Sequence, residues 1–238
     1  MAPEHLASPL ISIRHLHHRW PRDTRDCLAI DKLDVARGQA LFLHGPSGCG
    51  KSTLLGLMAG VLVATSGEVK VAGHDWASLP ARRRDAQRAD KLGVIFQQFN
   101  LLPYLSAIDN VLLPCRFSAA RARRAAEGSG SAEAAAAGLL QRVGLAPLLW
   151  PRPAAALSVG QQQRVAAARA LLGAPELVIA DEPTSSLDAD LREAFMSLLL
   201  ESVHEAGSTL VFVSHDERLA ERFDRRLSLP AINQATRA

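Results

Sequence analysis

The sequence contains no long apolar run and no recognisable leader. Its longest apolar stretch, at 54–64, is interrupted by Gly56 and Gly60 and is shorter than the roughly 18 residues of a membrane-spanning segment. The first residues, 1–5, lack the basic region and the apolar core that a secretory signal requires. We therefore expect a cytoplasmic protein without a membrane anchor of its own.

Cysteine is scarce and the charge is nearly balanced. The three cysteines, Cys27, Cys49 and Cys115, are scattered, which favours a reducing compartment over a disulfide framework. The formal net charge of +3 is small, so the excess of arginine indicates a solvated surface and no nucleic-acid partner. A chain of 238 residues is long enough for one α/β domain with a buried core.

What the sequence does contain is a phosphate-binding motif at 45–53. It matches the pattern G-x-x-x-x-G-K-[ST] and lies between an apolar strand pattern and a helical pattern. Its glycines let successive backbone N–H groups point at one anion, and the start of a helix adds partial positive charge. Lys51 would reach the β- and γ-phosphates, and the Ser52 hydroxyl would bind Mg²⁺. The predicted nucleotide-binding residues here are Gly45, Pro46, Ser47, Gly48, Cys49, Gly50, Lys51, Ser52 and Thr53.

A second segment indicates hydrolysis. The short apolar run 177–180 suits a strand that is buried on both faces of a parallel sheet, and it ends in Asp181 and Glu182. Open α/β sheets hold their ligands at the carboxyl ends of the strands. Asp181 would hold Mg²⁺ through water, and Glu182 would polarise the water that attacks the γ-phosphate. The alternative is an acidic turn that only ends a strand.

Four further segments occur in the order and spacing of a known family: Gln97 after the apolar run 92–96, Leu-Ser-Val-Gly-Gln-Gln-Gln-Arg at 157–164, Ser-Leu-Asp at 186–188, and His215 after the run 209–213. They resemble the Q-loop, signature, D-loop and switch histidine of ATP-binding cassette (ABC) proteins. The resemblance to an ABC nucleotide-binding domain covers about 10–229.

The resemblance implies an α/β fold: a phosphate-loop NTPase (RecA-like) core with an N-terminal antiparallel β region and an inserted helical subdomain. It implies one nucleotide-binding domain over 1–238. The core would comprise about 10–97 and 173–229, and the helical subdomain about 98–172.

The resemblance also implies ATP hydrolysis with Mg²⁺ and gives each motif a role. The implied catalytic residues are Glu182, His215, Gln97 and Lys51. The implied Mg²⁺ ligands are Ser52, Gln97 and Asp181. Beyond the phosphate loop, the implied nucleotide contacts are Trp20, which would stack on adenine, and Ser158, Gly160 and Gln161 of the signature. For Trp20 the alternative is an ordinary half-buried aromatic residue. Val159 departs from the family, which usually has glycine there, and this departure bears on the rate of turnover.

In this family two cassettes pair head to tail around two ATP molecules and drive a membrane permease. We therefore expect a homodimer, or a heterodimer with a paralogue, that lies peripherally on the inner face of the cell membrane and contacts it only through the permease. The stretch 94–103 is similar to that of the ATPases of lipoprotein-release, macrolide-export and cell-division systems, and the permease is expected to dock near 101–105. The alternative is the ATPase subunit of a solute importer. A soluble ABC ATPase of translation or DNA repair is disfavoured, because the chain has one cassette and no long coiled coil.

Residue patterns also predict secondary structure. Strands are expected at 10–16, 40–43, 68–71, 92–96, 177–180, 209–213 and 227–229. A helix is expected at 191–204, with Asp188 as its N-cap and Gly207 at its end. Within the segment 118–138, the Gly-Ser-Gly-Ser run at 128–131 is interpreted as a flexible, solvated surface connection that leads into an alanine-rich helix start; a regulatory site at the basic residues before it is the alternative. Cys49 is expected to be a reactive thiol, with an inward-turned, inert sulfur as the alternative.

Overall fold

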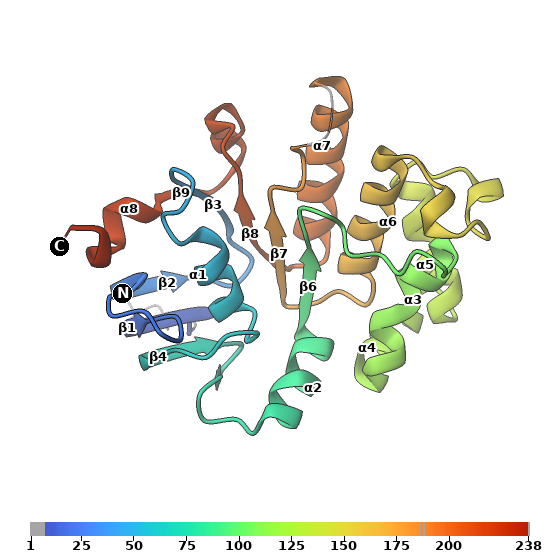
Figure 1. The fold of residues 1–238 in the computed structure, drawn as a ribbon. Helices are drawn as coiled ribbons and strands as arrows, with labels where there is room; N and C mark the ends of the chain where they lie inside the picture. The colour runs from blue at the N-terminus through green and yellow to red at the C-terminus, as the bar shows by residue number, and fades with distance from the viewer. Residues whose placement is uncertain (1–7, 186, 188, 238) are drawn as a thin grey trace, which may run out of the picture.

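The computed structural model describes residues 8–185, 187 and 189–237, and it contains two sheets with a helical region beside the second (Figure 1). The first sheet is antiparallel in the order β2-β1-β4-β5, with bounds β1 (Ile11–His18), β2 (Leu28–Val35), β4 (Ser66–Val71) and β5 (His74–Asp75). The second sheet is parallel in the order β6-β7-β8-β3-β9, with bounds β3 (Ala40–His44), β6 (Leu92–Ile95), β7 (Leu177–Asp181), β8 (Thr209–Val213) and β9 (Arg225–Ser228).

The described helices are α1 (Lys51–Met58), α2 (Ala81–Lys91), α3 (Ala107–Phe117), α4 (Ala119–Ala126), α5 (Ala132–Arg142), α6 (Val159–Leu171), α7 (Ala189–Glu205) and α8 (Leu229–Ile232). Short 3₁₀ turns occur at Pro147–Leu149, Ala154–Ala156, Glu217–Arg222 and Gln234–Arg237. Within this described part of the chain, every helix is too short or too polar to cross a bilayer.

The parallel sheet is built from apolar runs, as the sequence predicts. All five residues of β8 and the first four of β7 are buried, which is the pattern of strands covered on both faces. Strand β8 lies between β3 and β7. Because the carboxyl ends of parallel strands meet at one edge, the segments that follow β3, β7 and β8 come together there.

The strand prediction missed two strands and misplaced the end of a third. Strands β2 and β5 were not expected, and the strand expected at 227–229 ends one residue earlier, because Leu229 begins α8. Proline at the start of α8 favours this change, since its fixed φ suits the first turn of a helix. Helix α7 contains the predicted helix and Gly207 follows it with φ of 62°. The predicted cap, Asp188, lies outside the described residues.

The segment 118–138 forms α4 and α5, and the link between them, 127–130, is exposed, in agreement with the predicted surface connection and the helix start after it. A solvated loop is the wrong description only of the arginine-rich residues before the link, which form α4. Arg121 is 1% exposed, and its guanidinium donates to the carbonyls of Leu172 and Ala170, each at 2.7 Å. Burial lowers the pKa of Arg121 to about 10. Carbonyls at the C-terminal end of α6 carry partial negative charge, which offsets the cost of burying this cation.

Candidate nucleotide-binding site

The phosphate loop connects β3 to α1 and has the backbone shape that an anion site needs. Gly48 and Gly50 adopt φ of 79° and 102°, in the left-handed region that favours glycine. Within the described part of the chain, the N–H groups of Gly48 and Gly50 have no hydrogen-bond partner. These donors lie at the N-terminus of α1, where they can bind phosphate oxygens.

Lys51 lies inside this loop. Its side chain is 8% exposed, and Nζ donates to the Gly45 carbonyl at 2.7 Å and to the Pro46 carbonyl at 3.0 Å. These two bonds hold the ammonium group over the loop without a carboxylate partner. An incoming phosphate would therefore meet a cation that is already positioned and not neutralised by an acid.

Asp181 and Ser52 form the predicted cation-binding pair. The Ser52 hydroxyl is 3.4 Å from Oδ2 of Asp181, so the end of β7 meets the start of α1. Burial raises the pKa of Asp181, and the hydrogen bond from Ser52 opposes that shift. A hydroxyl and a carboxylate are oxygen donors of the kind that Mg²⁺ prefers, and a bound cation would favour the ionised carboxylate. The residues present therefore fit Mg²⁺.

Glu182 has the features of a general base. Burial raises the pKa of its carboxyl. Nε2 of His215 lies 2.9 Å from Oε1 of Glu182, within ion-pair distance, and His215 opposes the upward shift of the Glu182 pKa. The N–H of Glu182, whose φ is 47°, bonds the Val213 carbonyl at 3.0 Å. A carboxylate whose pKa is raised by burial and which lies beside an imidazole can accept a proton from water.

Gln97 and Trp20, two further predicted site residues, are both exposed. Gln97 lies in the turn after β6, and Trp20 follows β1 with 42% of its surface exposed and its ring edge-on to His18. The end of β1 is tied to the phosphate loop indirectly. The N–H of Cys27 bonds the His18 carbonyl at 2.9 Å, and the next residue, Leu28, packs against Gly50. Trp20 is therefore on the same side of the molecule as the phosphate loop.

The signature is separate from this group. Ser158 caps α6: its Oγ accepts from the Gln161 N–H, and the Gln161 side chain accepts from the Ser158 N–H at 2.9 Å. Val159 is 52% exposed, and a Cβ added to Gly160 would meet only Leu187, at 3.9 Å. Figure 1 places α6 and α1 on opposite sides of β7 and β8. The structure thus brings together 45–53, Asp181, Glu182 and His215 but leaves the signature at a distance.

One contributor to the site was missed by sequence reasoning. The tail residue Asn233 is fully buried and its amide donates to the carbonyls of Cys27 at 3.0 Å and Cys49 at 3.5 Å. Its Oδ1 accepts from the Ala29 N–H at 2.9 Å. Asn233 lies in the polar stretch 230–238, which carries no recognisable motif. No local pattern identifies this role, because the contact joins residues 184 positions apart.

Cys49 is turned away from solvent. It is 7% exposed, and its sulfur would lie 2.8 Å from a Cβ placed on Gly45. This burial favours the inward-facing alternative over the reactive thiol, because a buried thiol is poorly accessible. Of the D-loop segment, Ser186 and Asp188 lie outside the described residues.

The site combines the phosphate loop with the Ser52–Asp181 pair and with Glu182 beside His215. This combination defines a phosphate-loop ATPase. A family model described as ABC transporter matches residues 28–185. The chain therefore belongs to the ABC transporter family, and its sequence is similar to those of ATP-binding proteins of lipoprotein-releasing and macrolide-export systems.

Individual relatives agree with this assignment. The lipoprotein-releasing system ATP-binding protein LolD of Novosphingobium aromaticivorans is 41% identical over 94% of this chain and 97% of that protein. The macrolide export ATP-binding/permease protein MacB of Bradyrhizobium diazoefficiens is 38% identical over 94% of this chain, which spans only 33% of that protein. A dimeric structure of the ATP-binding cassette MJ0796, bound to ADP and Pi, matches with a TM-score of 0.80 and 31% identity over 94% of this chain and 95% of that chain.

Proposed function

We propose that two copies of this chain, or one copy and a paralogue, pair head to tail around two ATP molecules. The exposed, self-capped signature supports this arrangement, because it lies across β7 and β8 from the phosphate loop of its own chain, with open space at Gly160 (Figure 1). Each signature would then complete the phosphate loop of the opposite copy. The dimeric cassette MJ0796, a relative that this chain matches closely in fold, supports the same arrangement.

Within each site we propose that Glu182 acts as general base. The attacking water would transfer a proton to its carboxylate while the oxygen of water bonds the γ-phosphorus and the bond to ADP breaks. His215 would orient that water and the γ-phosphate, and Lys51 would bind the β- and γ-phosphates. Mg²⁺, when bound by Ser52, Asp181 and Gln97, supplies charge neutralisation at the phosphates. Trp20 would stack on adenine.

We propose core residues 10–97 and 173–229 and a helical subdomain at 98–172, and we propose that a separate permease docks on the latter. Tyr104, in the segment 101–105, supports this docking because it is 74% exposed. The permease would be of the lipoprotein-release or macrolide-export type, as the names of the relatives LolD and MacB suggest, and the protein would lie on the inner face of the cell membrane. A gene for a solute-binding protein beside that of this chain would favour the importer alternative.

The observation that carries the proposed chemistry is the partly buried Glu182 carboxylate at the end of β7, 2.9 Å from Nε2 of His215. Replacement of Glu182 by glutamine keeps the shape but removes the base. Turnover should fall by about 10²–10⁴-fold while ATP binding persists and the ATP-bound dimer accumulates. Steady-state ATPase assays of the reconstituted complex, with size-exclusion chromatography in ATP, measure both. Turnover at the wild-type rate in Glu182→Gln would contradict the assignment.

Docking is tested by cross-linking from position 104. Cysteine at Tyr104 should form a disulfide with cysteines placed in the permease when the complex is assembled. Cysteine at Phe117 is the matched control, because Phe117 is also 74% exposed but lies at the far end of α3. Failure at 104 and at every neighbouring position, with the complex intact, would locate the permease elsewhere.

A further inference from the structure

A cluster of three polar side chains lies at the carboxyl end of β3. His44 ends β3, Arg226 lies in the neighbouring strand β9, and Glu217 begins the 3₁₀ turn that follows β8. Nε of Arg226 donates to Nε2 of His44 at 3.0 Å, and the same guanidinium pairs with the Glu217 carboxylate. Nδ1 of His44 lies 3.4 Å from Oε1 of Glu217. Each of the three side chains therefore contacts the other two.

The arginine fixes the state and the orientation of His44. Because a guanidinium only donates hydrogen bonds, Nε2 of His44 is the unprotonated acceptor and the ring proton is on Nδ1, which faces Glu217. The His44 side chain is largely buried, and its ring centroid lies 6.1 Å from that of Phe42 in the same strand. The imidazole is thus held in one orientation at the end of β3.

The cluster joins two segments of the nucleotide site. His44 directly precedes Gly45, the first residue of the phosphate loop, and Glu217 is two residues after His215. The His215 side chain is 57% exposed, so its position depends mainly on the backbone of its own segment. The contacts of Glu217 hold that backbone at a fixed place relative to the start of the phosphate loop.

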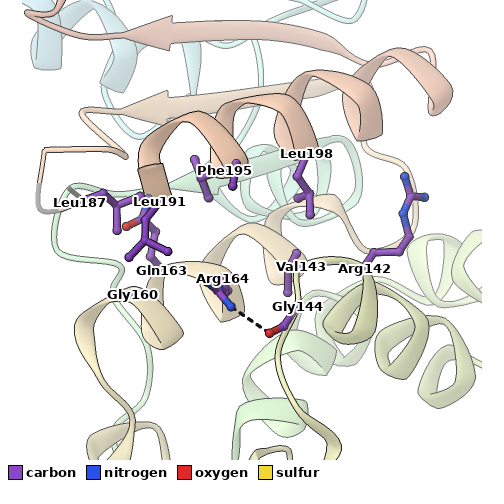
Figure 2. A pocket seen from close by; sticks show the side chains of 11 residues that line it. Arg142, Val143, Gly144, Gly160, Gln163, Arg164, Leu187, Leu191, Phe195 and Leu198 are labelled. Atoms are coloured by element: carbon purple, nitrogen blue, oxygen red, sulfur yellow. Dashed lines mark hydrogen bonds between the residues drawn. The ribbon is translucent and has the colours of Figure 1, made fainter. Parts of the chain in front are cut away.

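The same segment is also tied to α7, but that helix is less tightly packed. Asp216 pairs with Arg192 of α7 at 2.9 Å. Helix α7 borders a mainly apolar cavity of about 240 Å³, which its side chains help to line (Figure 2). A helix beside a void has fewer packing partners, whereas β3 and β9 are joined by strand pairing from Leu41 to His44. The tether at Glu217 is therefore the more rigid of the two.

We propose that His44, Glu217 and Arg226 are positioning residues that hold His215 in place for ATP turnover. The inference rests on the role proposed above for His215, which is to orient the attacking water and the γ-phosphate. Glu217 is 58% exposed, and exposed ion pairs contribute little to the free energy of unfolding. Loss of the cluster should therefore lower kcat and leave both stability and the KM for ATP nearly unchanged, because a small displacement of a positioning group slows the reaction more than it weakens binding.

Glu217→Ala tests the inference in the full chain. Steady-state ATPase assays should show a kcat about 3- to 10-fold lower than wild type, with the KM for ATP within about twofold. Glu193→Ala is the matched control and should leave kcat unchanged, because Glu193 pairs with Arg222 of the same 3₁₀ turn but ties it to α7. His44→Leu should reproduce the loss from the side of the phosphate loop. His44→Gln, which keeps an acceptor for Arg226, should retain at least about half of the wild-type kcat.

A double-variant cycle separates the positioning of His215 from a general structural role. In a His215→Ala background, which should itself be slow, Glu217→Ala should cause no further loss of kcat. A further loss in that background, or a wild-type kcat in Glu217→Ala alone, would overturn the inference and leave the role of His215 intact. A wild-type kcat in His215→Ala would overturn the proposed role of His215 and this inference with it. Thermal denaturation checks that each variant is folded; if His44→Leu is not, the Glu217 variants decide.

Discussion

The phosphate loop and the signature are both motifs at the N-terminus of a helix, yet the chain supports them differently. The loop is held from several directions: Lys51 bonds its carbonyls, Leu28 packs under Gly50, and Asn233 reaches it from the tail. The signature relies on itself, since Ser158 and Gln161 satisfy each other and Val159 is exposed.

The difference shows what each motif needs before nucleotide arrives. A loop that must wrap one anion requires a fixed backbone, because its donors have to converge without further ordering. A surface that completes a site on another copy needs only an intact helix start and open space in front of it. The following predictions test this contrast, in order of decreasing effect.

The largest contrast is expected between Lys51→Ala and Ser158→Ala in the isolated cassette. Loss of a charged donor to phosphate should weaken ATP binding roughly 10- to 100-fold. Ser158→Ala removes only a helix cap and should leave the affinity of a single cassette unchanged. Isothermal titration calorimetry with ATP measures both. Equal losses of ATP affinity in Lys51→Ala and Ser158→Ala would mean that a single cassette binds ATP with its own signature. The proposed difference between the two motifs would then be wrong.

A smaller effect is expected from Asn233→Ala. The substitution leaves the Ala29 N–H and the Cys27 carbonyl without their buried partner, so the free energy of unfolding should fall by about 1–3 kcal/mol. Affinity for ATP should fall with it, because the loop at Cys49 loses support. Chemical denaturation provides the measurement, and Gln234→Ala, at the exposed next position, provides the control. If Asn233→Ala has the same free energy of unfolding as Gln234→Ala, Asn233 does not stabilise the phosphate loop.

The smallest effect is expected on the signature side from Val159→Gly. Removal of the β-branched side chain would let a partner's phosphate approach the backbone more closely. Turnover of the paired cassettes should rise about two- to fivefold, which corresponds to about 0.4–1 kcal/mol of activation free energy. Val61→Gly, at a similarly exposed valine outside the signature, is the control. A turnover that stays at the wild-type value would show that Val159 does not limit the reaction.

The parts of the site that sequence predicts are those specified by neighbouring residues. The turn at Gly48 and Gly50, the start of α1 at Lys51 and the buried run before Asp181 each depend on a few consecutive residues. The order of strands then brings the segments after β3, β7 and β8 to one edge. The phosphate loop, Asp181 and Glu182 follow from these local patterns, whereas His215 follows only from the resemblance to ABC proteins.

The parts that sequence does not predict depend on distant contacts. Arg121 belongs to an arginine-rich segment that has the composition of a solvated surface, but it is buried because carbonyls 49 and 51 residues away accept its hydrogen bonds. Asn233 belongs to a polar tail and is buried for the same reason. The burial of a charged or amide side chain can be predicted only when its hydrogen-bond partners are known. For Arg121 and Asn233 these partners are distant in sequence and are brought close only by folding.

The contact between Asn233 and Cys49 has a consequence for the order of events during synthesis. The phosphate loop leaves the ribosome early, whereas its support from the tail is translated 184 residues later. A nascent chain that has folded as far as β9 therefore has the complete parallel sheet and loop without the amide that bonds the loop. Nucleotide binding at full strength should begin only after α8 has emerged and docked, so a stalled chain that ends before α8 should bind nucleotide weakly.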